Sequence, residues 1–146
     1  LGPREFDVLD ADGSRLAHLS DVRDFWRDTY EIVRGDGSML ATVARKMTFF
    51  SRRFSIALST GEEFMVEGNF FDREFNVVNT NGGGAVAQVS RERAGFAKAF
   101  LGHDRYALYY PPGTSPDRRL AILGGMIALD LMRAKDANSA ASYNST

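Results

Sequence analysis

The chain contains no cysteine, which excludes a disulfide framework, a thiolate zinc site and a cysteine nucleophile. It also lacks an excess of either charge, since 18 basic and 19 acidic residues give a formal net charge of -1. A dedicated nucleic-acid-binding protein normally carries a clear basic excess, so we expect no nucleic-acid partner. No spacing typical of a metal site or a cofactor site occurs, and we expect neither a metal nor a cofactor.

Long hydrophobic runs are also missing. The longest, Leu120–Leu129, gives roughly 20 Å of helix even when it is extended to Met132, whereas the hydrocarbon core of a bilayer is about 30 Å thick. The first residues, Leu1–Glu5, are mixed and no apolar run follows them, so no signal peptide is expected. These absences favour a soluble, cytoplasmic protein that associates with a membrane peripherally, if at all.

What the chain does contain is the composition of a globular domain. Of its 146 residues, 44% are hydrophobic and 12% aromatic. A chain of this length buries about two thirds of its surface on folding, which is enough for a core without covalent cross-links. We expect one domain over residues 1–136, followed by a small, polar and flexible tail over residues 137–146.

A repeat with constant internal spacing occurs four times. Each copy begins with an aromatic residue in an alternating segment and reaches a turn glycine seven residues later. These pairs are Phe6 and Gly13, Tyr30 and Gly37, Phe54 and Gly61, and Phe75 and Gly82. Alternating segments joined by Asp-Gly or Asn-Gly are typical of antiparallel β-hairpins. The repeat predicts four hairpins. Arg105–Tyr110 is expected to form a ninth strand. Pro111 ends this strand, because proline has no N–H group to donate to the ladder.

The pattern then changes to that of a helix. Ser115 and Pro116 form a helix-start signal, and the helix is expected to end near Arg133. Its apolar residues surround the axis, so we expect it to be buried on all sides, inside the sheet. Close approach to the strands would explain Gly124 and Gly125, which are unfavourable within a helix.

Few residues point to catalysis. His18 occupies an alternating strand position, which favours a half-buried structural histidine over a base, and His103 lies beside an acid in a predicted loop. No nucleophile elbow or zinc-protease motif is present, and we expect a protein that is not an enzyme. Asp10 and Asp12 resemble the start of a calcium loop, but Arg15 and the missing glutamate at the twelfth position favour a hairpin turn.

The candidate binding surface consists of basic residues that flank aromatic ones between the hairpins. Basic side chains beside exposed aromatic rings can hold anionic lipid headgroups while the rings enter the membrane interface. The alternative is that the aromatic residues close the ends of the core and the basic groups are solvated neighbours. The candidate lipid- or anion-binding residues are Arg45, Lys46, Arg52, Arg53, Arg91, Arg93 and Lys98.

Asp130 is a carboxylate in the last turns of the apolar helix. A buried charge without a partner is costly. We therefore expect a structural role in which Asp130 pairs with an arginine of the sheet, and not a catalytic one.

Several short segments occur in an order and spacing that match a known family. They are Tyr30-Glu31-Ile32, Gly35-Asp36-Gly37, Leu40-Ala41-Thr42-Val43, Arg45-Lys46 with Phe49-Phe50, Val66-Glu67-Gly68-Asn69-Phe70, Arg73-Glu74-Phe75, Val86-Ala87-Gln88-Val89-Ser90, Leu120-Ala121-Ile122 and Ala128-Leu129-Asp130. On these segments the chain resembles the LURP-one-related family, whose fold is tubby-like, or phospholipid scramblase-like. The resemblance covers about Phe6 to Met132 and implies a mainly β fold: an antiparallel β-barrel around a central hydrophobic helix.

The resemblance also implies a function. It points to a non-catalytic binding or scaffold domain, and the family shows an acid at the place of Asp130. Tubby-like relatives include phosphoinositide binders, so an anionic lipid headgroup is one expected ligand and a protein partner is another. The alternatives are a small-ligand carrier barrel, which needs an empty apolar interior, and a scramblase-like protein that interacts with membrane lipids.

One departure from the family concerns the number of strands. The family's barrel has about twelve strands and nine are expected here, with about one hairpin and one strand lacking before Phe6. Either Leu1 is not the biological start, or another segment closes the barrel, or the barrel is smaller or open. An open sheet leaves an edge that can pair, so we expect Phe6–Leu9 to be covered by another chain, in a homo-oligomer or by strand donation, or by non-native residues.

Overall fold

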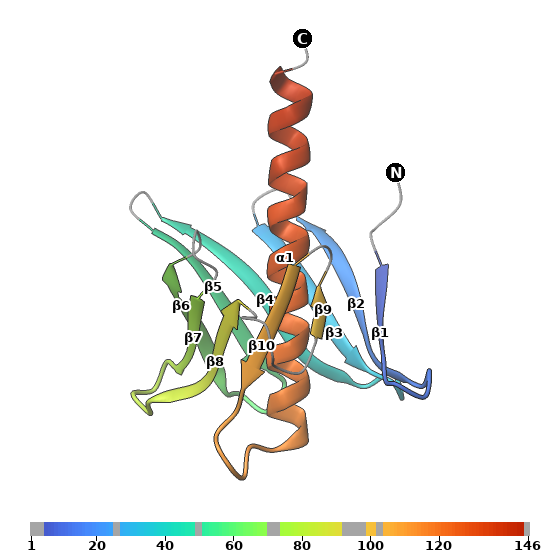
Figure 1. Cartoon of the computed structure of the whole chain (residues 1–146), viewed down its shortest axis with the longest axis vertical. Helices are drawn as coiled ribbons and strands as arrows, with labels where there is room; N and C mark the ends of the chain where they lie inside the picture. The colour runs from blue at the N-terminus through green and yellow to red at the C-terminus, as the bar shows by residue number, and fades with distance from the viewer. Residues whose placement is uncertain are drawn as a thin grey trace.

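A computed structural model describes residues 5–24, 27–48, 51–69, 74–91, 99–101 and 104–144, which form ten strands and one helix (Figure 1). The strands are β1 (Glu5–Leu9), β2 (Arg15–Asp24), β3 (Arg27–Arg34), β4 (Met39–Thr48), β5 (Ser51–Leu58), β6 (Glu63–Asn69), β7 (Glu74–Asn79), β8 (Ala85–Arg91), β9 (Ala99–Leu101) and β10 (Asp104–Tyr109); the helix is α1 (Pro116–Asn144). The mainly β class is confirmed. The strand that the sequence did not predict is the three-residue β9, which is too short to show an alternating pattern.

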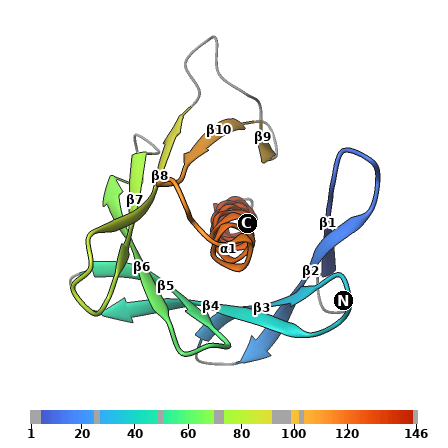
Figure 2. The same ribbon diagram turned by 90° about the horizontal axis from the view of Figure 1, so that it is seen from below.

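All ten strands belong to one antiparallel sheet in the order β1-β2-β3-β4-β5-β6-β7-β8-β10-β9. The hairpins expected from the repeat are confirmed, since each of β1 to β7 pairs with the strand that follows it. The sheet curls around α1, which lies on its concave side (Figure 2). Within the described ranges no ladder joins β1 to β9, so both are edges and a barrel closed by hydrogen bonds is not confirmed.

The hairpin turns have the conformation that their sequences predict. Gly13 and Gly37 have φ of 85° and 88°, in the left-handed region that glycine adopts without steric cost. In the first turn, the Ser14 backbone N–H and hydroxyl donate to Asp12 Oδ1 at 2.8 and 2.6 Å. The Asp12 carboxylate therefore closes the turn, which supports the hairpin interpretation over a calcium loop.

The core lies between the concave face of the sheet and α1. Side chains alternate between the two faces of a strand, and the apolar ones on the concave face are almost completely buried. They include Leu19, Ile32, Val43, Ile56, Phe64 and Val77 from the strands, and Ala121, Ile122, Met126, Leu129 and Met132 from α1. Burial of this apolar surface, at about 25 cal/mol per Å², holds the helix against the sheet.

Two glycines allow α1 to approach the sheet closely. A Cβ atom on Gly124 would lie 2.7 Å from Ile32 Cδ1, and one on Gly125 would lie 2.5 Å from Ile56 Cδ1. Carbon atoms in contact prefer separations of about 3.5–4.0 Å, so a side chain at either position would require the facing isoleucine to shift. This close approach is the reason for two residues that each cost the helix about 1 kcal/mol relative to alanine.

The helix is longer than its sequence predicts. It begins at Pro116 as expected but ends at Asn144, so the expected end near Arg133 is wrong and residues 137–144 are helical. The segment after Arg133 is rich in alanine and contains neither glycine nor proline, so no local signal stops the helix. Its C-terminal part projects beyond the sheet (Figure 1).

The burial of α1 is not complete around its axis. Four apolar residues, Leu120, Leu123, Ile127 and Leu131, are only partly buried. The expectation of burial on all sides is therefore wrong for one face of the helix. The physical reason is that the ten described strands do not close around the helix and so cover only part of its circumference.

Ion pairs fix the start of α1 to the rim of the sheet. Arg118 Nε and Nη2 donate to Glu62 Oε2 and Oε1 at 2.9 and 2.8 Å. Arg34 Nε and Nη2 donate to Asp117 Oδ1 and Oδ2 at 3.3 and 3.0 Å. Both are two-point contacts between a planar guanidinium and a carboxylate, which restrict orientation as well as distance. They hold the first turn of the helix at one end of the sheet.

Glu62→Gln is expected to lower the free energy of unfolding by less than about 1 kcal/mol at neutral pH, because both partners are 36% exposed and water screens the pair. The hydrogen bonds from Arg118 hold the pKa of Glu62 below its ordinary value of 4.5. The stabilisation is therefore present above the unfolded pKa and is lost as the pH falls through the lower folded pKa. Urea unfolding at a series of pH values should show the wild-type advantage vanish in acid.

A matched control for this prediction is Glu67→Gln, at an exposed glutamate of β6. Its free energy of unfolding should stay within about 0.5 kcal/mol of wild type. If the Glu62→Gln difference persisted unchanged in acid, the Arg118 contact would not be its source.

Candidate functional site

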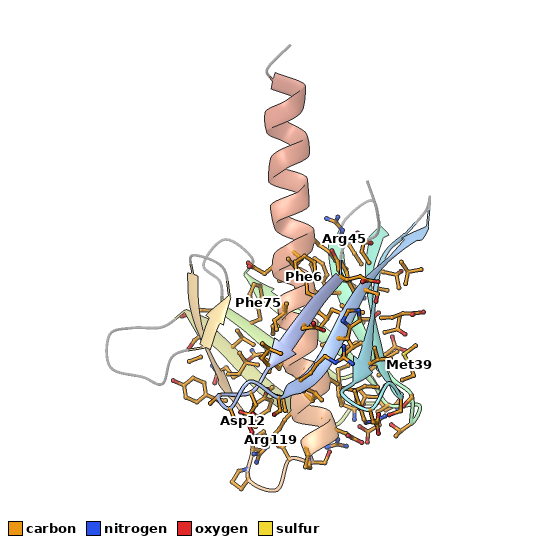
Figure 3. All side chains as sticks on the ribbon, turned by 90° about the vertical axis from the view of Figure 1, so that its right-hand side faces the viewer. Phe6, Asp12, Met39, Arg45, Phe75 and Arg119 are labelled. Carbon is orange, nitrogen blue, oxygen red and sulfur yellow. The ribbon has the colours of Figure 1, made fainter. Side chains whose placement is uncertain are left out.

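The two ends of the sheet carry different features. Because consecutive strands are antiparallel, β2, β4, β6 and β8 finish at one end, which we call the helix-exit end because α1 projects past it (Figure 1). The turns after β1, β3, β5 and β7 lie at the other end, where α1 begins. Figure 3 labels Asp12 and Arg119 at that end and Arg45 toward the helix-exit end. By their place in the chain, the predicted basic residues belong to strand ends at the helix-exit end or to the connection after β8.

The hairpin of β4 and β5 brings three of the predicted residues together. The register pairs Lys46 with Arg53 and Met47 with Arg52, so Lys46, Arg52 and Arg53 occupy one end of a single ladder. The Arg53 side chain is exposed. Like charges at directly opposite positions destabilise a sheet. The register places two basic residues, Lys46 and Arg53, at directly opposite positions of the ladder.

The other predicted basic residues are placed differently. Arg45 is 8% exposed and is engaged in an interaction within the fold, which weighs against contact with an external ligand. Arg91 ends β8, where it pairs with Tyr106 of β10. Arg93 and Lys98 lie outside the described residues. The roles predicted for these four residues stay predictions.

Charged groups also lie on the concave side of the sheet. Asp21 of β2 is 9% exposed, and the register places it opposite Tyr30 of β3. Asp130 of α1 is partly buried. Both aspartates are engaged in interactions, so neither is a buried carboxylate without a partner. The pairing of Asp130 with an arginine of the sheet stays a prediction.

His18 is part of a cross-strand contact on the convex face of β1 and β2. The register pairs His18 with Asp7, and His18 Nδ1 lies 2.7 Å from Asp7 Oδ1. Nη1 of Arg15 lies 3.7 Å from the same Asp7 oxygen. The hydrogen bond from His18 lowers the pKa of Asp7. His18 is 23% exposed along its side chain, as the half-buried interpretation predicted. His103 lies outside the described residues.

The arginines at the end where α1 begins already have carboxylate partners. Arg34 and Arg118 each hold one acid across two hydrogen bonds, as described above. Sequence reasoning missed both pairs because their members are 83 and 56 residues apart, and no local motif links them. This end is therefore occupied by contacts that position the helix.

Two further properties concern the part of the chain that the structure describes. In it, no group of three or more histidine, aspartate or glutamate side chains is placed to hold a metal ion. The helix of this part, α1, does not combine the length and the apolar character needed to cross a membrane.

The fold and the site together define a class of protein: one antiparallel meander curled around a C-terminal helix, with a cationic cross-strand pair at the end where the helix leaves. The chain belongs to the LURP-one-related family, whose family model matches residues 1–130. No curated protein and no solved structure matches it significantly.

Proposed function

We propose that this chain is a non-catalytic binding module that recognises anionic lipid headgroups, such as those of phosphoinositides, at the helix-exit end. The observation that carries the proposal is the pairing of Lys46 with Arg53 at one end of the β4–β5 ladder. Each basic residue close to an anionic membrane surface contributes about 1 kcal/mol to binding. A headgroup with several phosphate oxygens can contact more than one cation at once and offset their mutual repulsion.

A protein of this class acts by presenting a surface. The concave side of the sheet holds α1, whose Ile122, Met126 and Leu129 fill it with buried side chains. A carrier of small apolar ligands needs an open interior, so this packing disfavours the carrier alternative.

Vesicle co-sedimentation tests the proposal. The chain should sediment with vesicles of phosphatidylcholine containing a phosphoinositide, less so with phosphatidylcholine alone, and less at high than at low salt. Replacement of both Lys46 and Arg53 by alanine should weaken binding by about 30-fold, because two contributions of about 1 kcal/mol are lost.

The matched control is Arg119→Ala, which removes an exposed arginine from the end where α1 begins and should leave vesicle binding within about twofold. Binding that ignores both lipid charge and salt would refute an electrostatic headgroup site. Equal losses in the double variant and the control would show that total charge, and not the β4–β5 ladder, attracts the membrane.

A further inference from the structure

The turn between β7 and β8 is closed more loosely than the other three hairpin turns of the repeat. Its closing bonds, from Asn79 N to Gly84 O and from Gly82 N to Asn79 O, are 3.4 and 3.3 Å long. The corresponding bonds of the turns after β1, β3 and β5 lie between 2.8 and 3.0 Å. N–H···O bonds in proteins are ordinarily about 2.7–3.2 Å long, so the β7–β8 turn is the exception among the four. Three consecutive glycines, residues 82–84, give its backbone unusual freedom.

Asn81 in this turn also lacks the side-chain contact that holds the matching residue elsewhere. In the turns after β1 and β3, an aspartate precedes the turn glycine, and the serine after that glycine binds it. Asp36 Oδ1, for example, accepts the backbone N–H and the hydroxyl of Ser38 at 2.9 and 2.6 Å. In the β7–β8 turn, Gly83 stands in the place of that serine. Asn81 is exposed, and across the described ranges of the chain no hydrogen bond holds its side chain.

We propose that Asn81 is a modification site, at which the side-chain amide is lost by spontaneous deamidation. The backbone nitrogen of Gly82 gives up its proton and attacks Cγ of Asn81, and the side-chain amide nitrogen leaves as ammonia. Water then opens the resulting succinimide ring at either of its two carbonyl carbons. One opening gives aspartate, and the other gives isoaspartate, in which the main chain runs through Cγ. This site is separate from the β4–β5 ladder, and the proposal does not depend on lipid binding.

The conditions for ring closure meet at this residue. The asparagine side chain must turn onto the next backbone nitrogen, and a following glycine has no Cβ atom to obstruct this approach. Asn81-Gly82 is the one asparagine–glycine step in the sequence. The long bond from Gly82 N leaves the attacking nitrogen weakly held, whereas the matching bond from Gly37 N is 2.9 Å. The two aspartate–glycine turns could form the same ring, but serine hydroxyls hold their carboxylates, so we expect both to stay unmodified.

Deamidation changes the charge and the backbone of this turn. Thr80 donates its N–H and its hydroxyl to Glu63 O at 3.1 and 3.0 Å, so the residue before Asn81 is fixed to the neighbouring turn. Either product adds one negative charge, and isoaspartate also lengthens the main chain by one carbon atom. The modified chain should therefore be separable from the unmodified one by its charge.

Ageing of the full chain at physiological pH and temperature tests the proposal. Anion exchange should resolve a more acidic form, and peptide mapping by mass spectrometry should place the change from amide to acid at Asn81. Protein isoaspartate methyltransferase with labelled S-adenosylmethionine should label the same peptide. Asn76, which is paired on both sides within the sheet and precedes valine, should react at least tenfold more slowly. If Asn81 kept its amide while an isolated peptide of residues 76–88 lost its own, the proposal would be overturned.

Two variants test the part played by the turn. Gly83→Ser restores the serine of the first two turns and should slow the reaction at Asn81 at least threefold. A Cβ atom at Gly83 would lie 3.9 Å from the Asn79 side chain, so the serine fits. Thr60→Asn is the matched control, because it creates a second asparagine–glycine step in the β5–β6 turn, whose closing bonds are 2.8 and 3.0 Å. That step should react at least threefold more slowly than Asn81. Equal rates at the two steps, or an unchanged rate in Gly83→Ser, would overturn the assignment of the site to this turn.

Discussion

Phe64→Ala is expected to lower the free energy of unfolding by about 3–5 kcal/mol. Phe64 lies in β6 between Ile56 and Asn79, is completely buried, and has the Arg118 guanidinium 5.8 Å from its ring centroid. Truncation removes a large apolar surface from the core and leaves a cavity that the surrounding strands can fill only in part. Chemical denaturation should show a lower midpoint with an unchanged slope.

The control for the core substitution is Leu9→Ala, at a leucine that is 58% exposed near the end of β1. Its free energy of unfolding should stay within about 0.5 kcal/mol of wild type. If Phe64→Ala lowered the free energy of unfolding no more than Leu9→Ala, the Phe64 side chain would not face the core.

Gly125→Leu is expected to cost about 3 kcal/mol or more, although leucine is a better helix former than glycine by nearly 1 kcal/mol. A Cβ atom at this position would lie 2.5 Å from Ile56 Cδ1 and 2.9 Å from Ile56 Cγ1, both in a side chain that is completely buried. The added carbon atoms therefore require Ile56 to shift within the packed core or α1 to move away from the sheet. Thermal and urea unfolding measure the loss.

A double-mutant cycle locates this steric contact. Gly125→Ala alone should be destabilising by up to about 2 kcal/mol, since overpacking of about 1–3 kcal/mol opposes the gain in helix propensity. Ile56→Val removes the nearest atom, so the same alanine should cost at least about 0.5 kcal/mol less in that background. Additive effects, or a stabilising leucine at Gly125, would mean that the helix does not approach β5 as closely as the geometry requires.

Much of the fold could be predicted because its signals are local. The turns follow from pairs such as Asp12 with Gly13, where a side chain and a permissive backbone act within three residues. The strands follow from alternation over six to ten positions, and the start of α1 from Ser115 and Pro116. The end of α1 could not be predicted this way, since a change from apolar to polar residues marks the end of burial and not the end of a helix.

The candidate site was predicted in part. A cluster of basic residues was expected from their neighbourhood in the chain, and the ladder of β4 and β5 brings Lys46, Arg52 and Arg53 together because they flank one hairpin connection. The burial of Arg45 was missed. Whether a residue near a strand end faces the core or the solvent depends on its register with the neighbouring strands, which composition does not specify.

The sequence by itself determined the hairpins, the start of the helix and the family, because each depends on residues a few positions apart or on their order along the chain. Only the tertiary structure decided that no ladder joins β1 to β9 within the described residues, that one face of α1 is only partly buried, and that Arg118 meets Glu62 across 56 residues. These features arise from the summed curvature and register of ten strands. No single segment carries that sum, so it becomes defined only when the whole sheet has formed around the helix.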